Sequence, residues 1–131
     1  MSYPVCRKAT PVFFAPDITT GVAFWRDRLG FEVTTEVPGD NGPAFAILLG
    51  HGIELMYQAE AALAADPHAG QVTWHGDRSY LFVEVDDIDA IASALEGCEI
   101  LSPRHETFYG AIEIAYREPT GHVVTFAQFK R

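Results

Sequence analysis

The spacing of apolar residues predicts two copies of one strand–helix–strand unit. From Thr10 to Val33, a β-branched and aromatic run is followed by apolar residues at helical spacing. Gly30 then stands where a helix stop is expected. A weaker copy starts at Tyr80, with Asp87 at the expected start of its helix and Gly97 at the end. One supersecondary unit is therefore expected twice.

Turn residues and alternation predict the remaining elements. In the first unit we expect strands over 10–15, 31–37, 44–49 and 53–58, a helix over 17–29 capped by Asp17, and a loop over 38–43. In the second we expect strands over 79–85, 98–102, 111–117 and 122–129, a helix over 88–96, and a loop over 103–110. These are two βαβββ modules, about 9–58 and 79–129, joined by a linker over about 59–78 whose alanine-rich start is compatible with a helical turn. By length, residues 1–131 form a single domain of the α+β class.

Alternation within the strands separates an apolar face from a mixed one. In the strand over 79–85, the aliphatic residues at 81, 83 and 85 should pack under the helices, which leaves Tyr80, Phe82 and Glu84 on the opposite side. The strands over 53–58 and 111–117 likewise place Glu54 and Arg117 away from the helices. A face of aromatic, small and charged residues is typical of a ligand cavity, because pockets are largely apolar with a few polar groups.

The net charge of −9 narrows the range of expected partners. An acidic surface disfavours nucleic acid and anionic membranes, and it is weakly compatible with a cationic ligand. No run is long enough to span a membrane, and the N-terminus lacks the apolar core of a signal peptide. Cys6 and Cys98 are far apart in the sequence, which fits reduced thiols and a cytoplasmic location.

Four segments together resemble a known superfamily. The runs AFWRDRLGFEV, GIELMYQ, YLFVEVDDID and REPTGHVVTFAQF are similar to the vicinal oxygen chelate superfamily, which includes glyoxalase I, extradiol dioxygenases and bleomycin-resistance proteins. The resemblance covers about residues 9–129. It implies that the paired modules form an open mixed-sheet barrel around a cavity, with the helices on the outer face. Because many members are homodimers, it also implies a homodimer.

The resemblance implies four positions at which enzymes of this superfamily bind a divalent metal. Carried over to this chain, those positions hold Thr10, Glu54, Tyr80 and Thr125. Only Glu54 is a good metal ligand, whereas catalytic divalent sites normally offer three or more histidine or carboxylate ligands. We therefore expect no metal cofactor. This departure argues against glyoxalase or dioxygenase chemistry.

Other candidate residues have structural and functional interpretations. Glu54 is either a partly exposed strand residue or a carboxylate in a cavity, with Arg117 as one possible partner. The loop aromatics Trp74 and Phe108, together with Tyr109, either cover a sheet edge or stack on a ligand. None of the five histidines has metal-ligand spacing, although His75 and His105 flank predicted pocket loops.

Three functions follow as hypotheses. The first is a metal-independent protein that sequesters a hydrophobic or cationic small molecule, as bleomycin-resistance proteins do; its expected ligand-binding residues are Thr10, Glu54, Met56, Trp74, Tyr80, Phe82, Phe108, Arg117 and Thr125. The second is a lyase, isomerase or dioxygenase with an atypical metal site around Glu54 and loop histidines. The third is a regulatory module that keeps only the fold.

Overall fold

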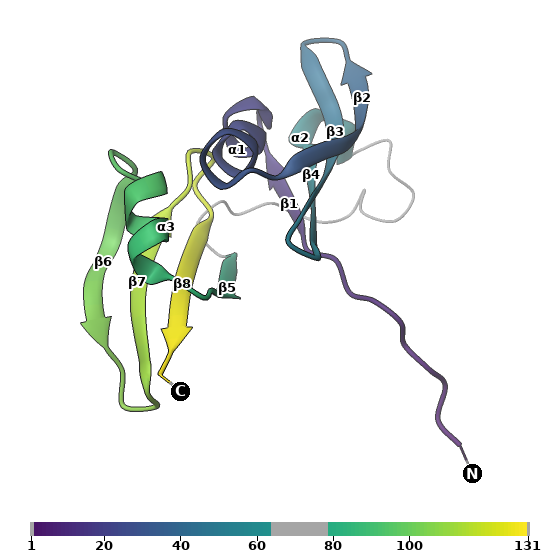
Figure 1. The fold of residues 1–131 in the computed structure, drawn as a ribbon. Coiled ribbons are helices and arrows are strands. Elements are labelled where there is room, and N and C mark those ends of the chain that lie inside the picture. The colour runs from purple at the N-terminus through teal and green to yellow at the C-terminus, as the bar shows by residue number, and fades with distance from the viewer. Residues whose placement is uncertain (1, 64–78, 131) are drawn as a thin grey trace.

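A computed structural model describes residues 2–63 and 79–130, and it contains the two predicted βαβββ modules (Figure 1). The first module comprises β1 (Val12–Ala15), α1 (Thr19–Ala23), the π-helix η1 (Phe24–Arg28), β2 (Glu32–Gly39), β3 (Gly42–Gly50), β4 (Ile53–Ala59) and the short α2 (Glu60–Leu63). The second comprises β5 (Tyr80–Glu84), α3 (Ile88–Ala94), β6 (Glu99–Glu106), β7 (Ala111–Arg117) and β8 (Val123–Phe129).

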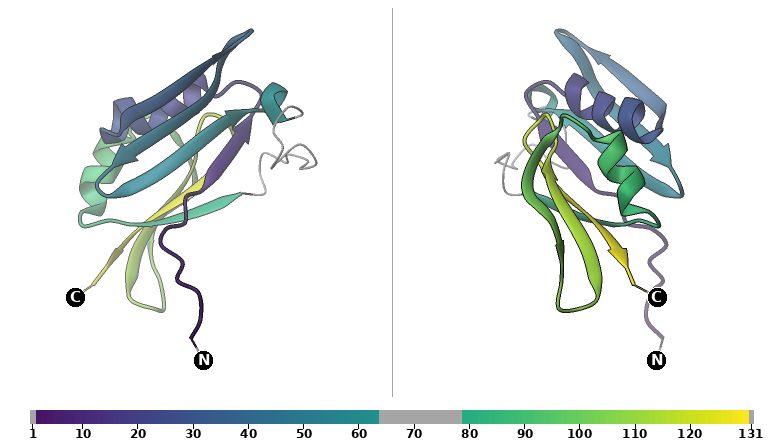
Figure 2. Two further views of the ribbon diagram at one scale, coloured as in Figure 1. Left: turned by 90° about the vertical axis from the view of Figure 1, so that its right-hand side faces the viewer. Right: turned by 60° about the vertical axis from the view of Figure 1, so that its left-hand side comes forward.

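Each module forms its own four-stranded mixed sheet (Figure 2). The strand orders are β1-β4-β3-β2 and β5-β8-β7-β6, so the two sheets repeat one topology. In both, the first strand runs parallel to the last strand of its module and the other pairings are antiparallel. The predicted α+β class with two βαβββ modules is therefore confirmed. Within the described residues, no helix is long and apolar enough to cross a membrane.

The loops predicted over 38–43 and 103–110 are partly wrong. β2 and β3 continue to a two-residue turn at Asp40 and Asn41, and Pro38 pairs with Pro43 in the ladder. β6 likewise continues through Pro103 to Glu106. Both β2 and β6 are edge strands, where a proline without an N–H removes no hydrogen bond from an inner ladder.

The first helix begins and ends differently from the prediction. The helix starts at Thr19 with Ile18 at the N-cap position, and the carboxylate of Asp17, the expected cap, accepts a hydrogen bond of 2.9 Å from the N–H of Thr19. Its last turn is a π-helix rather than an α-helix. Gly30 follows with φ of 74°, the left-handed conformation expected at the stop.

The two modules share one apolar core, because α1 and η1 contact both sheets (Figure 1). The indole of Trp25 lies 5.2 Å from the ring of Phe31 in the first module and 6.3 Å from the ring of Phe126 in the second, centroid to centroid. The aliphatic face predicted for β5 packs into this core, as do alternate residues of β4, β7 and β8. Within residues 2–63 and 79–130, no helix covers the opposite faces of the two sheets, which are called the helix-free faces below (Figure 2).

A buried chain of hydrogen bonds also joins the modules. The indole N–H of Trp25 donates to the Tyr57 hydroxyl at 2.9 Å, and that hydroxyl donates to the Glu118 carboxylate at 2.7 Å. Glu118 is only 1% exposed and accepts two further bonds, from the Thr120 hydroxyl and the backbone N–H of His122. Three donors therefore compensate for burying this carboxylate.

Gly21 marks the closest approach of α1 to this network. A Cβ atom at Gly21 would lie 2.6 Å from the Tyr57 ring and 3.0 Å from both Glu118 and Thr120. The absence of a side chain at this position therefore lets the helix reach the junction of the modules.

We expect Gly21→Ala to destabilise the protein by about 1–3 kcal/mol, because overpacking outweighs the gain in helix propensity. Urea denaturation measures the change. The matched control is Thr20→Ala at an exposed position of the same helix, which should be neutral or slightly stabilising. Equal effects of the two substitutions would contradict the close packing.

We expect the contribution of Tyr57 to stability to depend on alkaline pH. Burial, followed by the neighbouring Glu118, raises the pKa of Tyr57 well above 10.0. At pH values between the pKa of Tyr57 in the unfolded chain and its pKa in the folded protein, the native state binds more protons than the unfolded state. The free energy of unfolding therefore falls as the pH rises above about 10. Tyr57→Phe should cost about 2–4 kcal/mol at pH 8, because it leaves the indole and carboxylate without their shared partner.

Denaturation at pH 8 and at pH 11 measures this dependence. The stability gap between wild type and Tyr57→Phe should narrow by up to about 1.4 kcal/mol per pH unit above 10. A gap that stays constant or widens would show that Tyr57 is not held protonated in the native state.

Candidate functional site

The helix-free faces of the two sheets present different chemistry. In the first module the cross-strand register groups mainly apolar residues on this face: Val12 and Phe14 of β1, Phe45, Ile47 and Leu49 of β3, and Glu54, Met56 and Gln58 of β4. In the second module it groups Tyr80, Phe82 and Glu84 of β5, Glu113 and Ala115 of β7, and Thr125 and Ala127 of β8. The first face is largely aliphatic, and the second combines aromatic rings with carboxylates.

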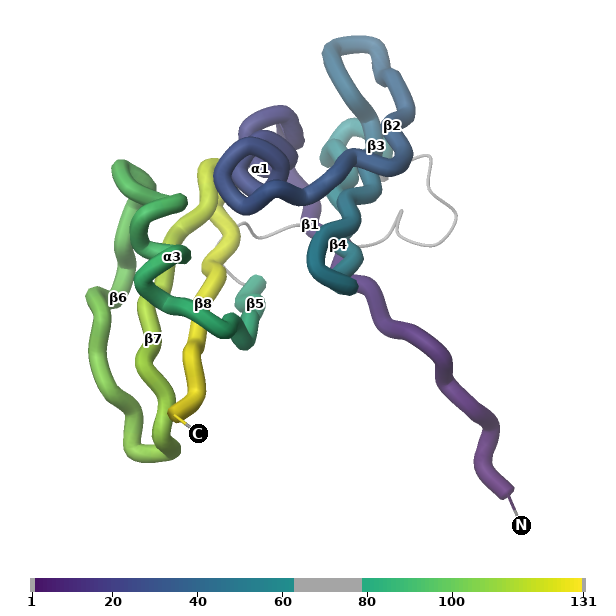
Figure 3. The backbone as a smooth tube through the Cα atoms, in the orientation of Figure 1, coloured from purple at the N-terminus to yellow at the C-terminus, as the bar shows by residue number. Residues whose placement is uncertain are grey.

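A groove of about 560 Å³ runs between β4 and β5, where the two faces adjoin. Glu54 lines it from the first module, and Phe82 and Glu84 line it from the second. Lys8 lines it from the extended arm of residues 2–9, which leaves the body of the protein (Figure 3). The groove is large enough for a small organic ligand.

Glu54 is engaged by two donors of its own module. Its carboxylate accepts a hydrogen bond of 2.9 Å from the Thr10 hydroxyl and pairs with the Lys8 ammonium at 2.8 Å. The contact with Lys8, followed by the contact with Thr10, holds the pKa of Glu54 below its usual range. Arg117, considered as its partner, instead pairs with Glu99 at 3.4 Å, so that pairing is wrong.

The corresponding pair in the second module is Tyr80 with Thr125. Their hydroxyl oxygens are 2.6 Å apart. Tyr80 is 64% exposed and the neighbouring Phe82 is 43% exposed, whereas Thr125 is buried. Thr10 thus contacts Glu54 and Tyr80 contacts Thr125, each pair within its own sheet.

These four residues do not fit a divalent metal. Two alcohols and one phenol are poor ligands at neutral pH, and the one carboxylate is already neutralised by Lys8. Over residues 2–63 and 79–130, no three His, Cys, Asp or Glu side chains gather closely enough to hold a metal ion.

The remaining residues expected at the site are dispersed. Met56 lies on the face of the first module beside Val12. Phe108 is fully exposed at the turn between β6 and β7, and Arg117 lies at the end of β7. Trp74 falls outside the described residues, as does His75. His105 is on β6, opposite Glu113 of β7.

Lys8 was not expected at these faces, whereas alternation placed Glu113 on the mixed face without assigning it to the binding site. Lys8 lies before the first predicted strand, and nothing in its neighbours in the sequence indicates the pairing with Glu54. Glu113 is 6% exposed, and its carboxylate accepts a hydrogen bond from the Tyr109 hydroxyl. The alternation in β7 could therefore have assigned Glu113 to the site.

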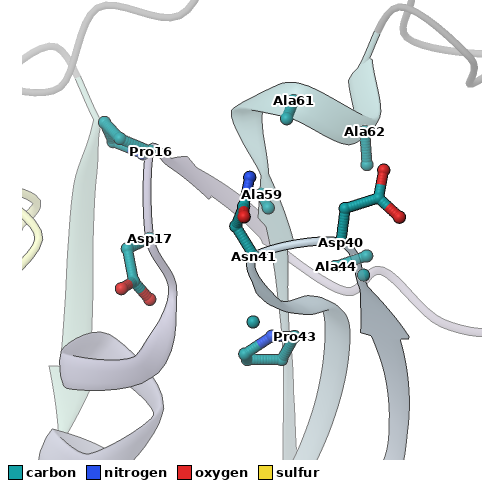
Figure 4. A pocket seen from close by; sticks show the side chains of 11 residues that line it. Pro16, Asp17, Asp40, Asn41, Pro43, Ala44, Ala59, Ala61 and Ala62 are labelled. Atoms are coloured by element: carbon teal, nitrogen blue, oxygen red, sulfur yellow. The ribbon is translucent and has the colours of Figure 1, made fainter.

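The described residues also form hollows outside this groove. One of about 250 Å³ lies between the start of α1, the β2–β3 turn and α2, with Asp17 and Asp40 at its rim (Figure 4). Another of about 560 Å³ lies between η1 and α3, where Arg28 donates hydrogen bonds to the carbonyl oxygens of Ala94 and Glu96. The second shares Ile53, Val83 and Glu84 with the groove between β4 and β5.

Fold, repeat and site together define a protein of two βαβββ modules whose helix-free sheet faces form a groove. Residues 9–126 match the family model of the Glyoxalase/Bleomycin resistance protein/Dioxygenase superfamily. The chain belongs to this superfamily, which confirms the resemblance seen in the sequence.

Solved structures show the same fold. A lactoylglutathione lyase from Agrobacterium tumefaciens is 18% identical, with a TM-score of 0.76 over 97% of this chain and 100% of that chain. TioX from Micromonospora sp. ML1 is also 18% identical, with a TM-score of 0.74 over 95% and 100%. The bleomycin-binding protein of Streptomyces verticillus, in complex with copper(II)-bleomycin, is 26% identical, with a TM-score of 0.66 over 98% and 100%. No curated protein matches the chain significantly.

We expect Lys8→Met to raise the pKa of Glu54 toward the ordinary value of a glutamate, because the hydrogen bond from Lys8, which lowers this pKa most, is lost. Carbon-detected NMR titration of the side-chain carboxyl measures this. Glu106 is the internal control, since its pKa is lowered by Lys130 and should not change. An unchanged pKa of Glu54 would show that Lys8 does not hold it in solution.

Proposed function

We propose that this protein binds a hydrophobic or cationic small molecule between the helix-free faces of its sheets, without a metal ion. One observation carries the proposal: the side chains at the four positions that correspond to the metal ligands of the superfamily's enzymes bind each other instead. Here they form two closed pairs, Thr10 with Glu54 and Tyr80 with Thr125. Neighbouring apolar surface remains exposed, including Val12, Leu49 and Phe82, although large exposed apolar groups are costly unless they serve binding.

The same four side chains favour sequestration of a ligand over metal-dependent catalysis, because two alcohols, a phenol and a paired carboxylate are poor metal ligands. The groove offers apolar walls with Phe82 on one side and the carboxylate of Glu84 in the second module, whereas the carboxylate of Glu54 is paired with Lys8. Such a lining suits an aromatic or aliphatic compound with a positive charge. The structural likeness to a bleomycin-binding protein supports an antibiotic as one member of this ligand class.

We propose further that two copies associate as a homodimer. Outside the groove, Val37 of β2 and Ile100 of β6 are large apolar side chains that are about half exposed, and an isologous contact would bury such residues in both copies at once. Light scattering coupled to size-exclusion chromatography tests this point, and a mass of 14.4 kDa at micromolar concentration would contradict it.

We also propose that the protein works in the cytoplasm. Its two cysteines, Cys6 and Cys98, are free thiols, which fits a reducing compartment.

Calorimetric titration with a panel of cationic and neutral aromatic compounds, including metal-free bleomycin, tests the proposed binding. We expect at least one compound to bind, and Phe82→Ala to weaken it by about tenfold, since a buried ring contact contributes about 1.4 kcal/mol. Phe108→Ala is the matched control, because that ring is fully exposed at a turn and should matter little.

Two results would contradict the proposal. One is the absence of binding by every compound at millimolar concentration. The other is a melting temperature that rises when stoichiometric Zn²⁺ or Ni²⁺ is added and falls back to its original value when a chelator is added, since that behaviour indicates a native metal site.

A further inference from the structure

The helix-free face of the second module contains a carboxylate set among aromatic rings. Glu113 lies in the middle of β7 and is 6% exposed. Its carboxylate accepts a hydrogen bond from the Tyr109 hydroxyl. This hydrogen bond is the main reason that the pKa of Tyr109 is raised. The phenol therefore stays protonated and keeps donating its hydrogen bond to the Glu113 carboxylate. A buried carboxylate with little hydration is costly unless a donor or cation compensates it.

Three aromatic rings follow one another on this side of the module, and the first of them, Tyr109, contacts the carboxylate. The ring of Tyr109 lies 6.0 Å from that of Phe129, and Phe129 lies 6.3 Å from Phe82, centroid to centroid. Tyr109 is 45% exposed and Phe82 is 43% exposed, so their surfaces are accessible. Accessible aromatic faces attract cations through their quadrupoles.

The arginines and lysines of this module do not neutralise Glu113, and His105, which lies opposite Glu113 on β6, has its Nδ1 atom 2.9 Å from the carbonyl oxygen of Pro103. Between residues 79 and 130 the sequence holds three arginines and lysines, and each pairs with another carboxylate: Arg104 with Asp89, Arg117 with Glu99, and Lys130 with Glu106. In the strand ladder, Glu113 pairs with Ala127, which in turn pairs with Glu84 of β5. A second acidic residue therefore lies on the same face, and charge complementarity points to a cation.

We infer that Glu113, together with Tyr109, Phe82 and Phe129, forms a subsite for the cationic group of an organic ligand, such as a quaternary or alkylated ammonium. The inference rests on the proposed function and deepens it, because it assigns the charged end of the ligand to the second module. The largely aliphatic face of the first module then receives the uncharged part. Glu54 is less suited to the charged end, because Lys8 already occupies its carboxylate.

The hydrogen bond between Tyr109 and Glu113 also closes the β6–β7 turn, so the test must separate charge from structure. Glu113→Gln keeps an oxygen that accepts the Tyr109 hydrogen bond and removes only the charge. Glu96→Gln, at an exposed residue just after α3, removes the same charge outside this subsite and is the matched control. Tyr109→Phe keeps the ring and removes the donor.

The probes are phenyltrimethylammonium and its neutral isostere tert-butylbenzene, titrated into the full chain and followed by protein NMR. For Glu113→Gln we expect affinity for the cation to fall by about tenfold and affinity for the neutral probe to stay within about twofold. Glu96→Gln should behave as wild type toward both probes. Tyr109→Phe should retain most of the affinity for the cation, since its ring remains.

Different results overturn the inference and the proposed function. If the cation binds the wild type but Glu113→Gln and Glu96→Gln bind it equally, the inference fails and the proposed function stands. If neither probe nor any member of the earlier panel binds, both fail. If Glu113→Gln leaves probe binding intact but alters the oligomeric mass, the face is an interface between copies, and the subsite is rejected.

Discussion

The Tyr57 hydroxyl donates a hydrogen bond to the buried Glu118 carboxylate, and much of the relation between the two modules depends on this contact. Tyr57 belongs to β4 of the first module, whereas Glu118 follows β7 of the second. A carboxylate that is 1% exposed is stable only if its donors hold their positions. The network therefore fixes where α1, the end of β7 and the start of β8 meet, and with them the two sheets.

This junction leaves the other side of each sheet without a helix. The two helix-free faces share a topology but differ in chemistry, because the repeat has diverged. One has aliphatic residues and a carboxylate neutralised by Lys8, and the other has aromatic residues around Glu113. A two-sided surface of this kind can distinguish the two ends of an asymmetric ligand, which a symmetric pair of faces could not do.

The fold was largely predictable because its signals are local. Helical spacing before Gly30, the cap at Asp87 and the alternation in β5 each depend on neighbouring residues, and all three are found in the structure. The extent of the edge strands was not predictable, because the tolerance for Pro38 and Pro103 depends on where their strands lie in the sheet. Likewise, the π-helix gives no pattern distinct from that of an α-helix.

The site was less predictable, because its contacts join distant parts of the chain. The family pattern led to Glu54 and Thr125, and alternation led to Tyr80 and Phe82. Arg117 was named as one possible partner of Glu54, but Lys8 pairs with Glu54 instead, from a distant segment without periodicity. Glu113 carries an alternation signal, but its burial beneath Tyr109 follows only from the turn between β6 and β7.

A crystal structure with the tightest-binding compound of the panel tests the account most directly, because it locates the ligand on one side of the sheets or the other. The account predicts density in the groove between Glu54 and Phe82, with the uncharged part of the ligand against the first module. Density confined to the helix side, between η1 and α3, or to the hollow beside Asp40 would contradict it.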